Sequence, residues 1–250
     1  MDAIQSSEGT WIYKKEEIKS HAIDFFSKLF SCNDEASFNF PIANAFPRID
    51  EYSLADLSRT VLNEEIKATV FGMNPLKAPG IDGLHDLFYQ SQWDVVGSSV
   101  CELVSNIFKG NPLPPELNKT LIVLIPKTNN PTNLRMFRPI SLCPVMYKTV
   151  TKILANRLKG ILPELIGPTQ TSFVPERQII ENIVMAQEII HTMRNKKGKI
   201  GQMAIKVDLE KTYDRLRWDF IHDALKDVRL PKEFIRITME YVTTARMQIL

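Results

Sequence analysis

The sequence lacks the features that mark membrane, secreted and disulfide-rich proteins. No apolar run approaches the ~20 residues that a membrane-spanning helix needs, and the polar stretch over residues 1–9 does not have the pattern of a signal peptide. The three cysteines, Cys32, Cys101 and Cys143, are far apart and fit neither a disulfide framework nor a zinc-binding spacing. We therefore expect an intracellular protein in a reducing compartment, with no segment in a membrane.

Internal repeats and low-complexity tracts are also absent, which excludes solenoid and linker-type chains. With 44% hydrophobic and 24% charged residues over 250 positions, the composition is that of a globular protein of one large or two small domains.

The small net charge of +2 conceals an uneven distribution. Residues 111–217 carry 17 Lys and Arg against 8 Asp and Glu, a net +9, whereas the rest of the chain carries −7. Concentrated positive charge favours a cleft that binds a polyanion. The alternative is a set of solvated lysines spread over the surface.

The spacing of apolar residues predicts both helices and strands, so we expect an α+β protein. The expected helices cover residues 14–30, 63–73, 93–108, 145–165, 179–193, 218–228 and 231–242. The expected strands cover residues 120–125, 136–142, 205–208 and 246–250. Within the helix over 145–165, the pattern places Lys148, Lys152, Arg157 and Lys159 on the solvent side.

The first two strands are joined by a polar segment and should form an antiparallel hairpin. Pro139 restricts Arg138 to extended geometry, and Lys127 directly follows the first strand. This places Lys127 and Arg138 near the same hairpin, although either one alone could be a surface residue whose long side chain reaches to solvent.

A dense cluster of turn-forming residues, NPLKAPGIDGL, covers residues 74–84. Such a segment can wrap a phosphate with Lys77 and backbone N–H groups, or it can simply join two helices. Joining two helices is the simpler interpretation.

The short apolar run before Asp208 predicts a strand that ends on a carboxylate. A strand end is a rigid place to hold a metal-bound phosphate, but an Asp at this position also often starts a turn or caps a helix. An unrelated phosphotransferase using Asp208 would carry a second Asp in a D-x-D pattern or a glycine-rich phosphate loop. The sequence has neither, because Leu209 and Glu210 follow Asp208.

Six blocks in the same order resemble the reverse transcriptase of LINE-type (non-LTR) retrotransposons, most closely those of plants. They are NPLKAPGIDGL, LIVLIPK, FRPISL, YKTVTKILANRLK, QTSFVPERQIIENI and KVDLEKTYDRLRW, and the resemblance covers residues 54–250. It implies a right-hand polymerase fold, with a connector over residues 1–53, fingers over residues 54–200 and an incomplete palm over residues 201–250.

The resemblance also implies roles for individual residues. Asp208 would be the first of three metal-binding carboxylates, with the backbone carbonyl of Leu209 assisting, and Tyr213 would pack under the incoming sugar and exclude a 2′-hydroxyl. Lys127 and Arg138 would hold the nucleotide triphosphate. The residues that would lie near template and nucleotide are Gln170, Phe173 and Arg177.

The implied cofactor is Mg²⁺ or Mn²⁺ with a dNTP substrate, and the implied partners are an RNA template and a DNA primer. In a full polyprotein, an endonuclease domain would precede this region and the rest of the palm and the thumb would follow, and the expected compartment is the nucleus.

Three residues depart from the family pattern. Glu176 stands where a Gly is usual, Met136 replaces an Asp and Thr212 replaces an Ala. The second catalytic block, an aromatic-x-Asp-Asp hairpin, is absent from these residues. We therefore expect a fragment with fingers and partial palm, truncated before that hairpin, and the alternative is a decayed copy that at most binds nucleic acid.

Overall fold

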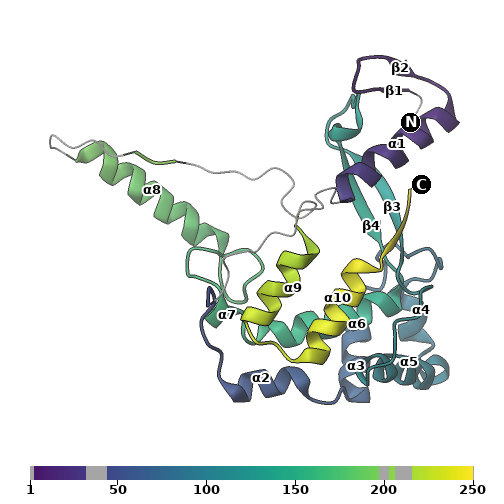
Figure 1. Ribbon diagram of the computed structural model, residues 1–250, viewed down its shortest axis with the longest axis vertical. Helices are drawn as coiled ribbons and strands as arrows, with labels where there is room; N and C mark the ends of the chain where they lie inside the picture. The colour runs from purple at the N-terminus through teal and green to yellow at the C-terminus, as the bar shows by residue number, and fades with distance from the viewer. Residues whose placement is uncertain (1–2, 32–43, 197–202, 206–215, 250) are drawn as a thin grey trace.

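The computed structural model describes residues 3–31, 44–196, 203–205 and 216–249. It begins with a two-stranded antiparallel sheet and a helix, and continues with helices that flank a three-stranded sheet (Figure 1). The strands are β1 (Ile4–Gln5), β2 (Trp11–Ile12), β3 (Lys119–Pro126), β4 (Phe137–Leu142) and β5 (Arg246–Ile249). The helices of the first half are α1 (Lys15–Phe30), α2 (Glu51–Ser58), α3 (Asn63–Phe71), α4 (Asp86–Ser91) and α5 (Trp93–Phe108). Those of the second half are α6 (Val145–Lys159), α7 (Leu162–Leu165), α8 (Ile179–Asn195), α9 (Trp218–Asp227) and α10 (Lys232–Thr243).

The larger sheet has the strand order β4-β3-β5. β3 and β4 form the expected antiparallel hairpin, in which Ile125 pairs with Arg138 and Pro126 pairs with Phe137. A short 3₁₀ turn, Leu134–Met136, leads into β4. β5 pairs with β3 in parallel, from Lys119 opposite Arg246 to Ile122 opposite Ile249.

The larger of two hydrophobic cores is built by α2, α3, α5, α6 and α10. The apolar residues of these helices recur every three or four positions, so that one face of each helix is buried. The most deeply buried include Ile66, Val104, Ile153, Ile237 and the large ring of Tyr241. This helical core supports the end of the sheet from which α6 and α10 extend.

The smaller core lies between α1 and one face of the β3–β4 hairpin. Ala22 and Phe26 of α1 are buried there together with Ile4 of β1 and Phe137 of β4. The N-terminal helix therefore covers one face of the hairpin, and it matches the helix expected over residues 14–30.

Two helical segments differ from expectation. The helix expected over residues 145–165 ends at Lys159, because Gly160 follows and α7 begins two residues later with Pro163 in its first turn. α8 has the expected apolar residues, yet none of its residues is buried within the described structure, and Figure 1 shows it extending away from the other helices.

The expectation that Arg157 lies on the solvent side of α6 is wrong, because its side chain is buried. Its guanidinium binds both carboxylate oxygens of Glu65 at 3.0 and 2.9 Å and donates to the carbonyls of Leu57 and Arg59. It also lies 5.5 Å from the centre of the Phe108 ring. Arg157 thus joins α6 to the connection between α2 and α3.

Candidate functional site

Three of the predicted site residues, Asp208, Leu209 and Tyr213, lie outside the described residues. The strand expected over residues 205–208 begins at Ile205, which is exposed and belongs to no regular element. In the structure, the described chain stops at Ile205, before both predicted metal ligands. Among the residues that it does describe, no group of three His, Cys, Asp or Glu side chains could hold a metal ion.

Lys127 and Arg138 lie at the same end of the β3–β4 hairpin. The backbone N–H of Lys127 donates to the carbonyl of Met136 at 2.8 Å, and its ammonium group donates to the carbonyl of Arg135 at 2.9 Å. Arg138 pairs with Ile125, two positions before Lys127, and its side chain is exposed. Both residues thus belong to the end of the hairpin next to the turn.

The two faces of the hairpin have different surroundings. Neighbouring side chains of a strand point to opposite faces, and Phe137 packs in the small core beneath α1. Arg138 is therefore on the other face, away from α1. Ile140 is exposed on the same face as Arg138. This face of the hairpin is therefore accessible to a ligand from Arg138 to Ile140.

A groove of about 1060 Å³ lies on the α1 side of the sheet. Its walls come from α1, from Pro139 and Ser141 of β4, from β5 and from the start of α9. Leu216 and Arg217, which directly follow the undescribed segment 206–215, line it. The basic residues along it are Lys19, Lys28 and Arg217. The part of the chain that the structure describes therefore resumes, at residue 216, along this groove.

Gln170, Phe173 and Arg177 belong to the connection between α7 and α8. The Phe173 ring is 79% exposed, and its backbone has φ +66°, a value uncommon for a residue with a side chain. Gln170 donates to the carbonyl of Ser172 at 3.2 Å. Figure 1 shows this connection and the β3–β4 hairpin in separate regions, so the structure does not bring these residues together with Lys127 and Arg138.

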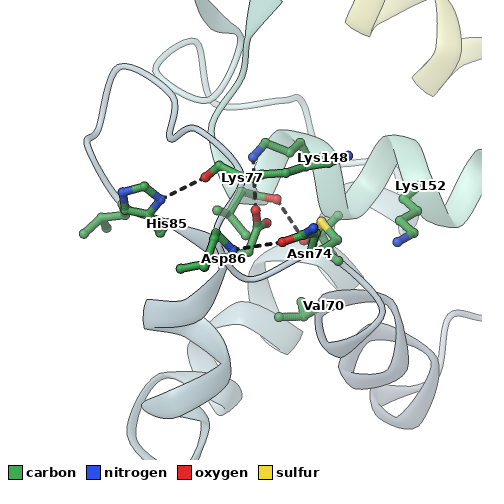
Figure 2. Close-up of polar contacts among 12 residues, drawn as sticks. Val70, Asn74, Lys77, His85, Asp86, Lys148 and Lys152 are labelled. Atoms are coloured by element: carbon green, nitrogen blue, oxygen red, sulfur yellow. Dashed lines mark hydrogen bonds and ion pairs between the residues drawn. The ribbon is translucent and has the colours of Figure 1, made fainter.

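The turn segment over residues 74–84 joins α3 to α4, as the simpler interpretation predicted. Gly80 packs directly on the chain between β4 and α6, where an added Cβ would lie 2.4 Å from the nitrogen of Pro144. His85 Nδ1 contacts the carbonyl of Lys77 at 2.8 Å, which closes the segment on itself (Figure 2). Lys77 itself is exposed.

Sequence reasoning missed a buried carboxylate beside this segment. Asp86, the first residue of α4, is fully buried, and Lys148 reaches it from α6 (Figure 2). An acid in the first turn of a helix is a recognised signal for a helix start, but nothing in the sequence shows that it is buried. Nearby, Lys152 donates to the carbonyl of Gly72 at 2.7 Å. Burial and the charges of Lys77 and Lys159 lower the pKa of Lys152.

Comparison with known proteins gives the class and the family of the chain. A family profile described as reverse transcriptase (RNA-dependent DNA polymerase) matches residues 125–249, half of the chain. This match implies a polymerase-like fold, with which the helix-rich architecture and its small sheets are consistent. The chain belongs to the reverse transcriptase family.

Three curated relatives extend the similarity. The "Transposon TX1 uncharacterized 149 kDa protein" of Xenopus laevis is 28% identical over 92% of this chain. Retrovirus-related Pol polyproteins from a type-2 retrotransposable element of Drosophila melanogaster and a type-1 element of Nasonia vitripennis are 24% and 28% identical over 74% and 72% of the chain. The chain spans only 17 to 18% of the length of these relatives. The closer resemblance to plant elements stays a prediction.

In the described part of the chain, no helix is both long enough and apolar enough to cross a bilayer.

Proposed function

We propose that this chain is the fingers and first part of the palm of a non-LTR reverse transcriptase, which extends a DNA primer on an RNA template. The observation that carries the proposal is the family match over residues 125–249, which begins in β3 and runs to β5. Because the chain spans less than a fifth of its relatives, the activity is proposed for a longer protein that contains it.

Lys127 and Arg138 are proposed to hold the triphosphate of the incoming nucleotide. Both sit at one end of the hairpin, and Arg138 lies on the face that α1 leaves uncovered. The ammonium group of Lys127 makes one hydrogen bond, at the surface, to the carbonyl of Arg135. A phosphate oxygen can replace that carbonyl at little cost, because charge-assisted hydrogen bonds are the stronger kind.

Asp208 and the carbonyl of Leu209 are proposed to hold the divalent metal, Mg²⁺ or Mn²⁺, and Tyr213 is proposed to exclude a 2′-hydroxyl. A carboxylate and a backbone carbonyl are hard oxygen donors, the ligands that Mg²⁺ prefers. The chemistry that the metal supplies in such sites is neutralisation of charge on the phosphates.

We further propose that the strand ending on Asp208 lies beside β5, with Asp208 directed to the face of the sheet that carries Arg138. β5 is an edge strand of the described sheet, so its outer backbone groups are available for pairing. Leu216 and Arg217 lie close to β5, with which they line the groove, and this supports placing the strand before them next to β5.

The basic segment 111–217 is proposed to bind RNA or an RNA–DNA duplex through phosphates, with Gln170 and Phe173 near the strand. Fluorescence anisotropy with a labelled duplex tests this. For three to five phosphate contacts, affinity should fall roughly 20- to 500-fold when salt rises from about 50 to about 200 mM. The matched control is Lys14→Gln, an exposed lysine outside the segment, which should leave affinity unchanged. Equal wild-type affinity at both salt concentrations would contradict an electrostatic site.

Primer extension tests the proposed reaction. The 250 residues alone should not incorporate dNTPs on an RNA template with Mg²⁺, because holding two divalent cations takes several carboxylates and Asp208 supplies one. A longer chain that includes the Asp-Asp hairpin and the thumb should extend the primer, and Asp208→Ala should abolish that extension. Incorporation by the 250 residues that disappears in Asp208→Ala would show that the remaining ligands lie within this chain.

One observation favours a second candidate, a decayed copy that binds nucleic acid without catalysing transfer. Glu176 occupies the left-handed backbone region, with φ +65°, where the family resemblance expects a glycine. A side chain at such a position costs of order 1 kcal/mol. Failure of the longer chain to extend a primer, with RNA binding retained, would select this candidate.

A further inference from the structure

The guanidinium group of Arg177 is surrounded by backbone carbonyls. Its Nη1 donates to the carbonyls of Gly167 at 2.6 Å and Gln170 at 2.8 Å. Its Nη2 donates to those of Ile166 at 2.9 Å and Pro163 at 3.2 Å. Four carbonyls, one from α7 and three from the chain between α7 and α8, therefore point at one side chain.

These four bonds occupy the donors that phosphate recognition requires. A guanidinium has five N–H groups, two on each terminal nitrogen and one on Nε, and a bidentate phosphate contact uses a parallel pair of them. In Arg177 both terminal nitrogens are already directed at carbonyls. A bidentate phosphate contact uses at least one terminal nitrogen, so it would have to break at least one of these bonds.

A second side chain ties down the same connection. The amide of Asn182, in the first turn of α8, donates to the carbonyl of Thr169 at 2.9 Å and to the hydroxyl of Thr171 at 3.2 Å. Thr171 and Val174 are buried, whereas Phe173 between them is exposed. The connection thus has a folded inner side, held by Arg177 and Asn182, and an outer side that carries Phe173.

We propose that Arg177 is a positioning residue, which folds residues 163–178 so that Gln170 and Phe173 are presented to nucleic acid. Its guanidinium donates hydrogen bonds to the four carbonyls of the protein and makes no contact with a phosphate. This inference rests on the proposed function, in which the connection lies against template or primer. It replaces the simpler expectation that Arg177 itself contacts nucleic acid.

Substitution by lysine separates the two roles. Arg177→Lys keeps the positive charge but loses the planar fork that reaches several carbonyls at once. If Arg177 positions the connection, Arg177→Lys and Arg177→Ala should both weaken duplex binding by a similar factor, roughly fivefold or more if stacking of a base on Phe173 is lost. Comparable affinity of Arg177→Lys and wild type would overturn the inference.

The salt dependence of binding gives an independent readout. Each phosphate contact contributes about 0.7 to 0.9 to the slope of log affinity against log salt. A positioning residue makes no such contact, so Arg177→Ala should weaken binding with the wild-type slope. A slope lowered by about that amount, seen in Arg177→Ala and not in Arg177→Lys, would assign Arg177 to a phosphate.

Rescue through the backbone provides a third test. Glu176→Gly removes the side chain at φ +65° and should help the connection to keep its shape. In the Arg177→Ala background, Glu176→Gly should therefore recover part of the lost affinity. Glu176→Gln removes the same negative charge but keeps a side chain there, so it is the matched control. Equal recovery by the two would mean that charge, and not backbone shape, limits binding.

A last experiment tests the role of Arg177 without nucleic acid, and so independently of the proposed function. It measures the hydrogen exchange of residues 163–182 by mass spectrometry. Arg177→Lys and Arg177→Ala should both exchange faster there, with the exchange of α5 and α6 unchanged at temperatures well below unfolding. If the wild-type chain does not bind nucleic acid, the proposed function fails and this comparison still tests the role of Arg177. Unchanged exchange in both variants would refute that role.

Discussion

The carboxylate of Asp86, fully buried at the start of α4, lies 3.4 Å from the ammonium group of Lys148 in the first turn of α6. One oxygen, Oδ2, faces Lys148, and the other, Oδ1, has no hydrogen-bond partner in the described structure. Lys148 is less deeply placed, with 23% of its side chain exposed. The pair is therefore asymmetric, because one ion can reach water and the other cannot.

This asymmetry predicts unequal effects of removing either partner. Lys148→Met leaves a buried carboxylate without a counter-ion and should lower the free energy of unfolding by about 3 kcal/mol or more. Asp86→Asn leaves an ammonium group that can turn to solvent, so the loss should be about 1 kcal/mol. The double variant should recover most of the loss caused by Lys148→Met. Urea unfolding of all four proteins measures this cycle, and equal losses in the single variants would contradict it.

Gly80 should tolerate no side chain. A Cβ there would lie 2.4 Å from the nitrogen of Pro144 and 2.6 Å from the carbonyl carbon of Cys143, and these backbone atoms cannot move aside as a side chain can. Gly80→Ala should therefore destabilise the fold by about 3 kcal/mol, the upper part of the range for overpacking. Thermal unfolding measures the loss. Gly167→Ala is the control, because nothing lies within 4 Å of its Cβ position, and it should unfold like the wild type.

Arg157 should be far more sensitive to substitution than Arg59, although both bind Glu65. Arg157→Lys removes a fork that contacts both oxygens of Glu65 and two carbonyls, and it should cost roughly 2 to 4 kcal/mol. The side chain of Arg59 is 44% exposed and contacts Glu65 at 3.3 Å, so Arg59→Lys should cost less than about 1 kcal/mol. Similar unfolding free energies for the two variants would show that burial of the ion pair between Arg157 and Glu65 does not increase its contribution to stability.

The carboxylate of Asp227 at the end of α9 should make stability depend on pH. Burial raises its pKa, but hydrogen bonds from the backbone N–H groups of Asn44, Ala45 and Phe46 outweigh that effect, so the pKa lies below the ordinary value of 3.8. A depressed pKa stabilises the fold above pH 3.8, and this contribution disappears as the pH falls through the lower, folded-state pKa.

Asp227→Asn should therefore lower the free energy of unfolding at neutral pH, and the difference from wild type should shrink as the pH falls below 3.8. Urea unfolding at several pH values measures it. Asp24→Asn, an exposed carboxylate on α1, is the control and should leave stability unchanged at each pH. A difference between Asp227→Asn and wild type that stays constant over this range would mean that the hydrogen bonds do not depend on the charge.

The elements that the sequence predicted best are those with strong local periodicity. α5 has the bounds that were expected, and the β3–β4 hairpin was recognisable from two apolar strands joined by a polar turn. α2 was missed because it is short, although Asp50 is a typical capping residue and accepts a hydrogen bond from the N–H of Ser53 at 2.9 Å. Gly160 and Pro163 are helix-breaking residues, so the break between α6 and α7 could have been predicted from the sequence.

What could not be predicted depends on residues far apart in the chain. Arg157 follows the polar periodicity of α6, and its burial is stabilised by Glu65 and by carbonyls about 100 positions earlier. For the candidate site, local chain geometry was enough to predict the hairpin that carries both Lys127 and Arg138. The family resemblance implied that Arg177 lies near template and nucleotide, but the sequence could not show that its guanidinium binds four backbone carbonyls.

The parallel pairing of β5 with β3 has a consequence for the order of folding. Lys119 and Arg246, which face each other across these strands, are separated by 127 positions, whereas only residues 127–136 join β3 to β4. Closing a long loop costs entropy before any contact compensates for it. The hairpin can thus form early during synthesis, while the third strand joins only after α10 has been made. The wall of the groove that β5 supplies can therefore form only after the hairpin, once synthesis has passed Ile249.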